Sequence, residues 1–130
     1  TVGHWLQARA VRALALASTG LRVEAAVLER HPVTKRDRPS ATARVLAGAW
    51  PSRLTALECQ RHGPQVSEHT FRLTLGPSET LTLHHDVRRL DAAAAGAVLA
   101  ARWAHAARPG FRVIGDVYDE MTKVTDDHAH

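Results

Sequence analysis

The sequence predicts an α+β domain with two layers, in which helices cover a mostly antiparallel sheet. Three observations support this prediction: an apolar stripe at helical spacing near the start, an alternating hairpin in the second half, and an alanine-rich helix directly after the hairpin. The 130 residues allow one core, and 45% apolar with 23% charged residues is an ordinary globular composition. We therefore expect a single domain over residues 1–130.

The first predicted element is an amphipathic helix that ends near Gly20. Its apolar positions fall on one helical face: Leu6, Ala10, Ala13, Leu14 and Ala17. From Leu21 the period changes to two, and the apolar side of this alternation carries Leu21, Val23, Ala25 and Val27. Such alternation predicts a half-buried strand.

Residues 41–62 give weaker signals. Ala43, Val45 and Ala47 alternate as in a strand, although alanine favours helices, and we interpret this stretch as a strand. The stretch from Pro51 to Gly63 suits either a helix or a strand, and both interpretations stay open.

The pattern is clearest from Thr70 onward. Apolar and polar residues alternate on both sides of the turn sequence Gly-Pro-Ser-Glu at 76–79, which predicts an antiparallel hairpin that ends near Val87. Asp91 is a suitable N-cap for a second helix that runs to about Arg108.

The second helix presents a narrow face of small residues that also carries Trp103. We expect this face to lie close on the sheet, with Trp103 in the core. Pro109-Gly110 ends the helix, and alternation over residues 111–117 predicts a last strand.

The net charge of +4 arises in one segment. Its basic residues are Arg30, Lys35, Arg36, Arg38 and Arg44, against the single acid Asp37. Two prolines in this segment disfavour regular structure, so we predict an exposed basic loop at 31–40. The opposite charge gathers after Gly115, where residues 119–130 are expected to form a mobile acidic tail.

No catalytic motif is evident. No serine lies in a nucleophile-elbow pattern, and no glycine-rich phosphate loop occurs. The single cysteine, Cys59, excludes an internal disulfide and is expected to act as a small buried hydrophobe. His84 and Asp86 share a strand face and could supply two metal ligands, with a further ligand from His62 or His69. We expect no cofactor.

The segment from Phe71 to Val117 resembles tail-completion, or tail-terminator, proteins of tailed phages. It contains Phe-Arg-Leu-Thr-Leu, then Leu-Thr-Leu-His-His-Asp-Val, then Asp91 at the start of an alanine-rich helix, then the last predicted strand. The resemblance covers about a third of the chain and rests on the order of elements. It implies a ring-forming structural subunit with no catalytic residues.

The leading functional hypothesis is therefore a non-enzymatic assembly subunit that binds protein partners and forms a homo-oligomer through oppositely charged patches. The residues expected at this interface are Arg30, Lys35, Arg36, Arg38, Arg44, Trp5, Asp116, Asp119 and Glu120. The second hypothesis is a small nucleic-acid-binding module that uses Lys35, Arg36, Arg38, Arg9 and Arg12. A metal-dependent enzyme centred on His84 and Asp86 is the third.

The sequence predicts no signal peptide and no transmembrane segment, because its apolar runs are short and are interrupted by charged residues. We expect no membrane association, and a location in the cytoplasm or in a virus-like particle.

Overall fold

The computed structural model describes residues 1–64 and 66–123. Its elements follow in the order α1 (Val2–Ala17), β1 (Glu24–His31), α2 (Ala41–Ala49), β2 (Ala56–Arg61), β3 (Ser67–Thr74), β4 (Thr80–Val87), α3 (Asp91–Ala106) and α4 (Ile114–Met121). The predicted first helix, first strand and hairpin are present as α1, β1 and the pair β3 and β4. The face predicted for the first helix is wrong, because α1 buries Gln7, Ala8 and Val11 while Leu6 is 53% exposed.

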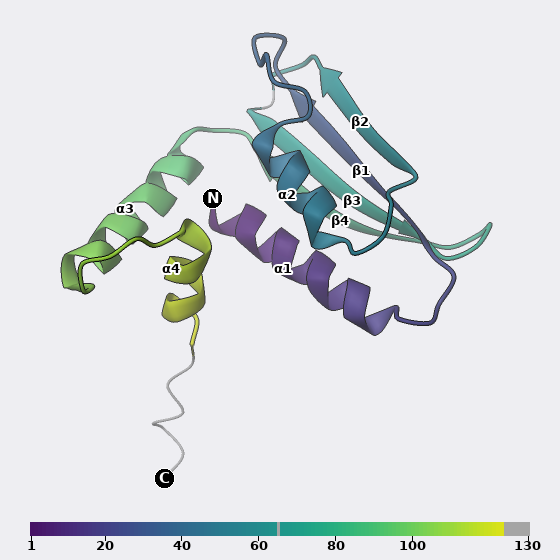
Figure 1. Ribbon diagram of the computed structural model, residues 1–130. Coiled ribbons are helices and arrows are strands. Elements are labelled where there is room, and N and C mark those ends of the chain that lie inside the picture. The colour runs from purple at the N-terminus through teal and green to yellow at the C-terminus, as the bar shows by residue number, and fades with distance from the viewer. Residues whose placement is uncertain (65, 124–130) are drawn as a thin grey trace.

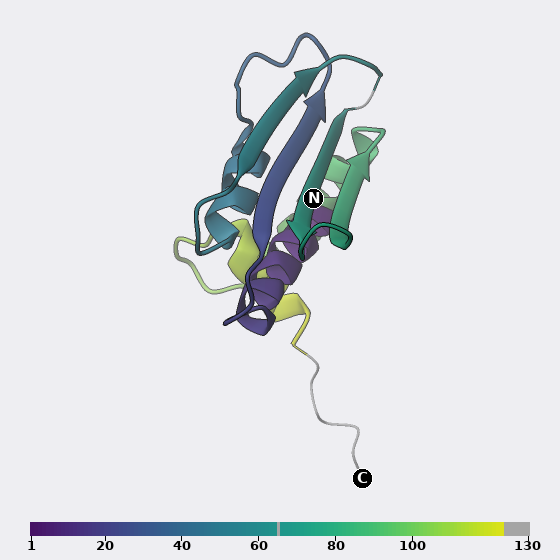
Figure 2. The ribbon, with the colours of Figure 1, turned by 90° about the vertical axis from the view of Figure 1, so that its right-hand side faces the viewer.

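The sheet has four strands in the order β2-β1-β3-β4. β1 pairs in parallel with β2, and the other two pairings are antiparallel. α2 lies in the connection between the two parallel strands, as a parallel pair requires. α1 and α2 pack on one face of the sheet and leave the other face uncovered (Figures 1 and 2). This arrangement confirms the predicted α+β architecture.

The core lies between this sheet and the helices α1 and α2. Its largest fully buried apolar side chains are Phe71 and Leu46, and Trp50 packs on Phe71 with 5.5 Å between ring centroids. Along β1, alternation turns Ala25 and Val27 toward the helices. The same alternation turns the next inward residues, Glu29 and His31, into the protein interior, so the apolar row of β1 continues as a polar one.

Residues 41–49 form α2, so the predicted strand over Ala43, Val45 and Ala47 is wrong. Ser40 caps the helix, because its Oγ accepts a hydrogen bond from the Ala43 amide at 3.1 Å. The buried positions Ala43, Leu46 and Ala49 follow helical spacing. Residues 56–61, for which both interpretations were open, form the edge strand β2.

The predicted last strand over residues 111–117 is also wrong. Phe111 and Val113 are 88% and 51% exposed, whereas α4 buries Val117 and Tyr118. Asp116 starts this helix, since its carboxylate accepts the Val113 amide hydrogen at 3.3 Å.

α3 begins and ends close to its predicted bounds, but it lies away from the sheet (Figure 1). Its buried residue is Gly96, where a Cβ atom would come within 2.8 Å of the Tyr118 hydroxyl of α4. Trp103 is half-buried and donates a hydrogen bond to Glu120 at 3.0 Å. The expectation that α3 lies on the sheet with Trp103 in the core is therefore wrong.

Among the described residues, no helix combines the length and the apolar character needed to cross a bilayer.

Candidate functional site

A cluster of buried polar side chains lies beneath the basic loop, and we call it the Glu29 cluster. Its members are Glu29, His31, Ser40, Arg61 and His69, all of them buried. Glu29 and His31 come from β1, Arg61 from the end of β2, His69 from β3, and Ser40 from the residue that precedes α2.

The Glu29 carboxylate is the centre of the cluster. The Ser40 amide donates to both of its oxygens, at 3.2 and 3.1 Å, and Arg61 Nη2 donates to Oε1 at 2.7 Å. Burial alone would raise the pKa of this carboxyl group, but hydrogen bonds from Ser40 and Arg61 outweigh it and lower the pKa to about 2.

Arg61 joins the carboxylate to the backbone of the basic loop. Its Nε donates to the Lys35 carbonyl oxygen at 3.1 Å, and Nη2 donates also to the Asp37 carbonyl oxygen. A further bond runs from Nη1 to the Gln60 carbonyl oxygen at 2.8 Å. The planar guanidinium group therefore holds the loop at several points.

Two histidines complete the cluster. His31 Nδ1 lies 3.2 Å from the Val66 carbonyl oxygen, and its Nε2 lies 3.4 Å from Glu29 Oε2. His69 Nε2 lies 3.2 Å from Ser40 Oγ and 3.7 Å from the same carboxylate oxygen. Burial lowers the pKa of His69 to about 3, so this imidazole is neutral at pH 7.

Glu29, His31 and His69 offer ligand atoms within 4.8 Å of one another, a spacing at which they could hold a metal ion. The carboxylate already pairs with Arg61, however, and a second cation beside that guanidinium group would be repelled in a site of low polarity. We therefore interpret the group as an ion pair supported by hydrogen bonds.

A pocket of about 860 Å³ adjoins the start of α2. Ala41 and Thr42 line it where the basic loop ends. Its charged lining is balanced, because Arg9 and Arg12 of α1 face Asp116 and Asp119 of α4, and Arg9 pairs with Asp119. The apolar part of its wall comes from α1, α2 and the region around the start of α4: Trp5, Ala8, Leu16, Val45, Val113 and Ile114. A ligand with a large apolar surface suits such a wall.

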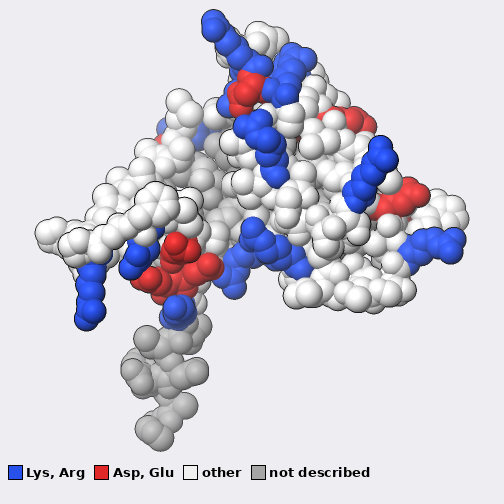
Figure 3. Space-filling model, in the orientation of Figure 1, with Lys and Arg blue, Asp and Glu red and all other residues white. Residues whose placement is uncertain are grey.

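The charged residues predicted for an interface do not form one continuous patch (Figure 3). Blue side chains gather over the basic loop, where Lys35 pairs with Asp37 at 2.9 Å. Red side chains gather over α4, where Asp119 pairs with Arg9 of α1. The ring of Trp5 lies 4.9 Å from the Arg9 guanidinium carbon. Lys35 and Asp119 each have an ion-pair partner within the chain, and Trp5 contacts Arg9. The role of these residues at an interface stays a prediction.

The other predicted basic residues make local contacts. Arg44 donates to the Pro39 carbonyl oxygen at 2.6 Å, and Arg30 pairs with Glu68 at 3.3 Å. Arg36 and Arg38 are exposed. Of the predicted acidic tail, residues 119–121 belong to α4, and residues 124–130 lie outside the described part of the chain.

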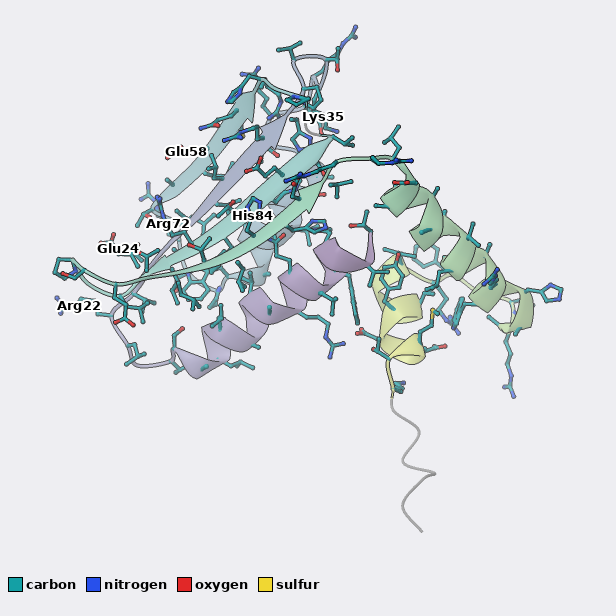
Figure 4. All side chains as sticks on the ribbon, turned by 180° about the vertical axis from the view of Figure 1, so that it is seen from behind. Arg22, Glu24, Lys35, Glu58, Arg72 and His84 are labelled. Carbon is teal, nitrogen blue, oxygen red and sulfur yellow. The ribbon has the colours of Figure 1, made fainter. Side chains whose placement is uncertain are left out.

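His84 and Asp86 lie on the uncovered face of the sheet, where Figure 4 labels His84 beside Arg72. His84 Nδ1 lies 2.9 Å from Thr70 Oγ1, and Asp86 pairs with Arg88 at 2.6 Å. His69 belongs to the opposite face and supplies no third ligand there. A metal site at His84 and Asp86 stays a prediction.

The sequence analysis missed Glu29, His31 and Arg61 as members of a site. A signal for the first two was present, because they continue the inward-facing row of the predicted first strand. A charged residue and a histidine at inward positions indicate buried partners. Cys59 lies two residues before Arg61 and therefore on the same face of β2. It was expected to be buried and is half-buried, and burial is the main cause that raises the pKa of its thiol.

Comparison with known proteins defines the family. Residues 3–118 match the family model described as dihydrodipicolinate reductase, C-terminus. This match covers most of the chain, so the chain belongs to that family.

Particular relatives agree with this assignment. The chain is 35% identical over 113 residues to a 4-hydroxy-tetrahydrodipicolinate reductase of Myxococcus xanthus (strain DK1622), which covers 70% of this chain and 41% of that protein. The fold of the present chain is similar to that of a dipicolinate-bound dihydrodipicolinate reductase from Paenisporosarcina sp. TG-14, with a TM-score of 0.53 and 20% sequence identity. The match covers 75% of this chain and 44% of that one. The chain therefore spans less than half the length of these relatives.

Family membership corrects the functional hypotheses. The resemblance to phage tail-completion proteins is wrong, as are the expectations of a non-enzymatic assembly subunit and of a particle-associated protein, because the matching family is one of reductases. The alternatives of a nucleic-acid-binding module and of a metal-dependent enzyme do not match this family either.

We predict that stability falls as the solution becomes acidic below pH 6.5. Burial lowers the pKa of His69 to about 3 and that of His4 to about 4, from 6.5 in the unfolded chain. The unfolded state therefore binds more protons below pH 6.5. His69 removes up to about 1.4 kcal/mol per pH unit until its folded pKa is reached, and His4 removes less because it is partly exposed to solvent. The Glu29 carboxyl group adds a further loss only below its unfolded pKa of 4.5.

Urea unfolding at pH 7.5, 6 and 5 measures this dependence. The variant His105→Asn, at an exposed position of α3, serves as the control. Its free energy of unfolding should change with pH as steeply as that of the unaltered chain. A free energy of unfolding that stays constant from pH 7.5 to pH 5 would contradict the prediction.

We predict that Arg61→Met lowers the free energy of unfolding by about 3–5 kcal/mol, because it leaves the buried Glu29 carboxylate without its counter-ion. The double variant Glu29→Leu/Arg61→Met should recover part of this loss. The control is Arg9→Met, which removes an ion pair to Asp119 whose side chains are 53% and 49% exposed; it should cost less than about 1 kcal/mol. Equal losses for Arg61→Met and Arg9→Met would disprove the role of the buried pair.

Proposed function

We propose that this chain forms the substrate-binding part of a reductase that acts on 4-hydroxy-tetrahydrodipicolinate or a closely similar cyclic dicarboxylate. The basic loop and the first turn of α2 would receive a carboxylate group of the substrate. The activity follows the names of the family and of its relatives, and the place of binding follows from the charges and geometry of this chain.

The observation that carries the proposal is the attachment of the basic loop to the Glu29 cluster. Arg61 fixes the carbonyl groups of Lys35 and Asp37, and Glu29 fixes the amide of Ser40. The loop therefore keeps one conformation, in which the partly exposed ammonium group of Lys35 pairs with Asp37 at 2.9 Å, and a substrate carboxylate would bind it in place of Asp37. A rigid cation beside a helix N-terminus is suited to binding a carboxylate.

A second part of the proposal concerns the source of reducing equivalents. A reductase needs a source of reducing equivalents, and residues 1–64 and 66–123 contain no glycine-rich loop between a strand and a helix of the kind that binds dinucleotides. We propose that a part corresponding to the remainder of the longer relatives carries this function, and we derive no redox step from the present residues.

This proposal also gives a reason for the exposed apolar side chains around α3 and α4. They are Leu90, Val98, Phe111, Val113, Ile114 and Met121. We propose that they contact that remaining part. The predicted homo-oligomer is part of the same proposal, with the uncovered sheet face around Glu58 and Arg72 as its candidate surface (Figure 4).

Titration with dipicolinate tests the site, because this planar dicarboxylate is the molecule bound in the similar structure. We expect calorimetric binding that Lys35→Met weakens about tenfold or more, corresponding to about 1.4 kcal/mol for a lost charged contact. Arg53→Met, at an exposed position before β2, is the matched control. Absence of binding, or equal weakening by both variants, would contradict the proposal.

A further inference from the structure

A small cavity of about 120 Å³ lies behind the Glu29 cluster. His4 of α1, His69 of β3 and His85 of β4 line it, together with Thr42 of α2. The Glu29 cluster and this cavity share His69, whose two ring nitrogens therefore belong to different surroundings.

The three histidines have an unusual property in common. The Nδ1 atoms of His4, His69 and His85 are all buried, and within the described part of the chain none has a hydrogen-bond partner. A buried polar atom without a partner costs about 1–3 kcal/mol, and nearly all such atoms in folded proteins are paired. Three of them around one cavity indicate that the cavity contains their partner.

The surroundings of His69 define what that partner must offer. Its Nε2 faces Ser40 Oγ at 3.2 Å and the Glu29 carboxylate at 3.7 Å. The negative carboxylate attracts a proton on Nε2, so we infer the neutral tautomer that carries its proton on Nε2 and donates it to Ser40 Oγ. Nδ1 then presents a lone pair to the cavity and requires a hydrogen-bond donor.

Water meets this requirement. It donates two hydrogen bonds and accepts two, so it can satisfy Nδ1 atoms in either tautomer. A volume of 120 Å³ has room for a few molecules at about 30 Å³ each, and polar walls retain them. His4 and Thr42 also line the 860 Å³ pocket, so the two spaces are neighbours.

We propose that ordered water occupies this cavity and holds His69 as a positioning residue for Ser40. The Glu29 carboxylate favours the ring proton on Nε2, water bound at Nδ1 satisfies the nitrogen that this tautomer leaves without a proton, and Nε2 holds the Ser40 hydroxyl group. Ser40 in turn caps α2 and binds Glu29 through its amide. Only one step of this inference rests on the proposed function: the effect of Ser40 on substrate binding, because Ser40 ends the loop that would bind the carboxylate.

Nuclear magnetic resonance of the chain labelled with ¹⁵N in histidine tests the inference without any substrate. Long-range ¹H–¹⁵N correlations should show His69 protonated at Nε2 alone at pH 7, and its ring CH protons should give cross-relaxation signals to long-lived water. Exposed His105 should show a mixture of tautomers and no such signal. A proton on Nδ1 of His69, or no water signal there, would overturn the proposal.

The variant His85→Leu separates a hydrated cavity from an empty one. If water is bound, removal of one polar wall weakens its binding, so the water signal at His69 should fall at least twofold and the melting temperature should drop. In an empty cavity the same change removes an unsatisfied nitrogen, and the melting temperature should rise. His105→Leu is the control. Failure of dipicolinate to bind would leave these readouts unchanged, so the two proposals fail separately.

Discussion

The buried ion pair between Glu29 and Arg61 is the interaction on which the rest of the site depends. Glu29 comes from β1 and Arg61 from the adjacent parallel strand, and their side chains meet at 2.7 Å beneath the basic loop. Because Arg61 also binds loop carbonyl oxygens and Glu29 binds the Ser40 amide, one charged pair fixes the end of the sheet, the loop and the start of α2 together.

Such a pair contributes geometry more than stability. Removal of two charges from water is costly, and an apolar pair of the same size would often be as stable. The cost is offset here by hydrogen bonds to both partners. What the pair supplies is a loop with one conformation, in which Arg61 binds the Lys35 carbonyl oxygen and the side chains of Arg36 and Arg38 remain exposed. A site that binds an anion benefits from cations that are already in place before the anion arrives.

The sequence could predict those parts of the fold in which local pattern and tertiary contacts agree. The alternation around residues 76–79 became the hairpin of β3 and β4, and Ala25 and Val27 of the predicted apolar row are buried in β1, whereas Leu21 lies before the strand and is 60% exposed. α2 and α4 were missed because three alternating residues outweighed helical spacing, which in α4 runs through Ile114, Val117, Tyr118 and Met121. The Glu29 cluster joins three strands and a helix cap, and no local pattern shows that β2 pairs with β1. The phage resemblance failed because unrelated α+β domains share an order of elements.

The most direct test of this account is hydrogen exchange at the Ser40 amide, measured by nuclear magnetic resonance at neutral pH. The account predicts that this amide exchanges almost as slowly as the amides of the central strand β1, because it donates to a buried carboxylate that Arg61 holds in place. The amides of Val33 and Thr34, in the exposed part of the loop, should exchange quickly. Equally fast exchange at Ser40 and Thr34 would show that the Glu29 cluster does not fix the loop and would contradict the account.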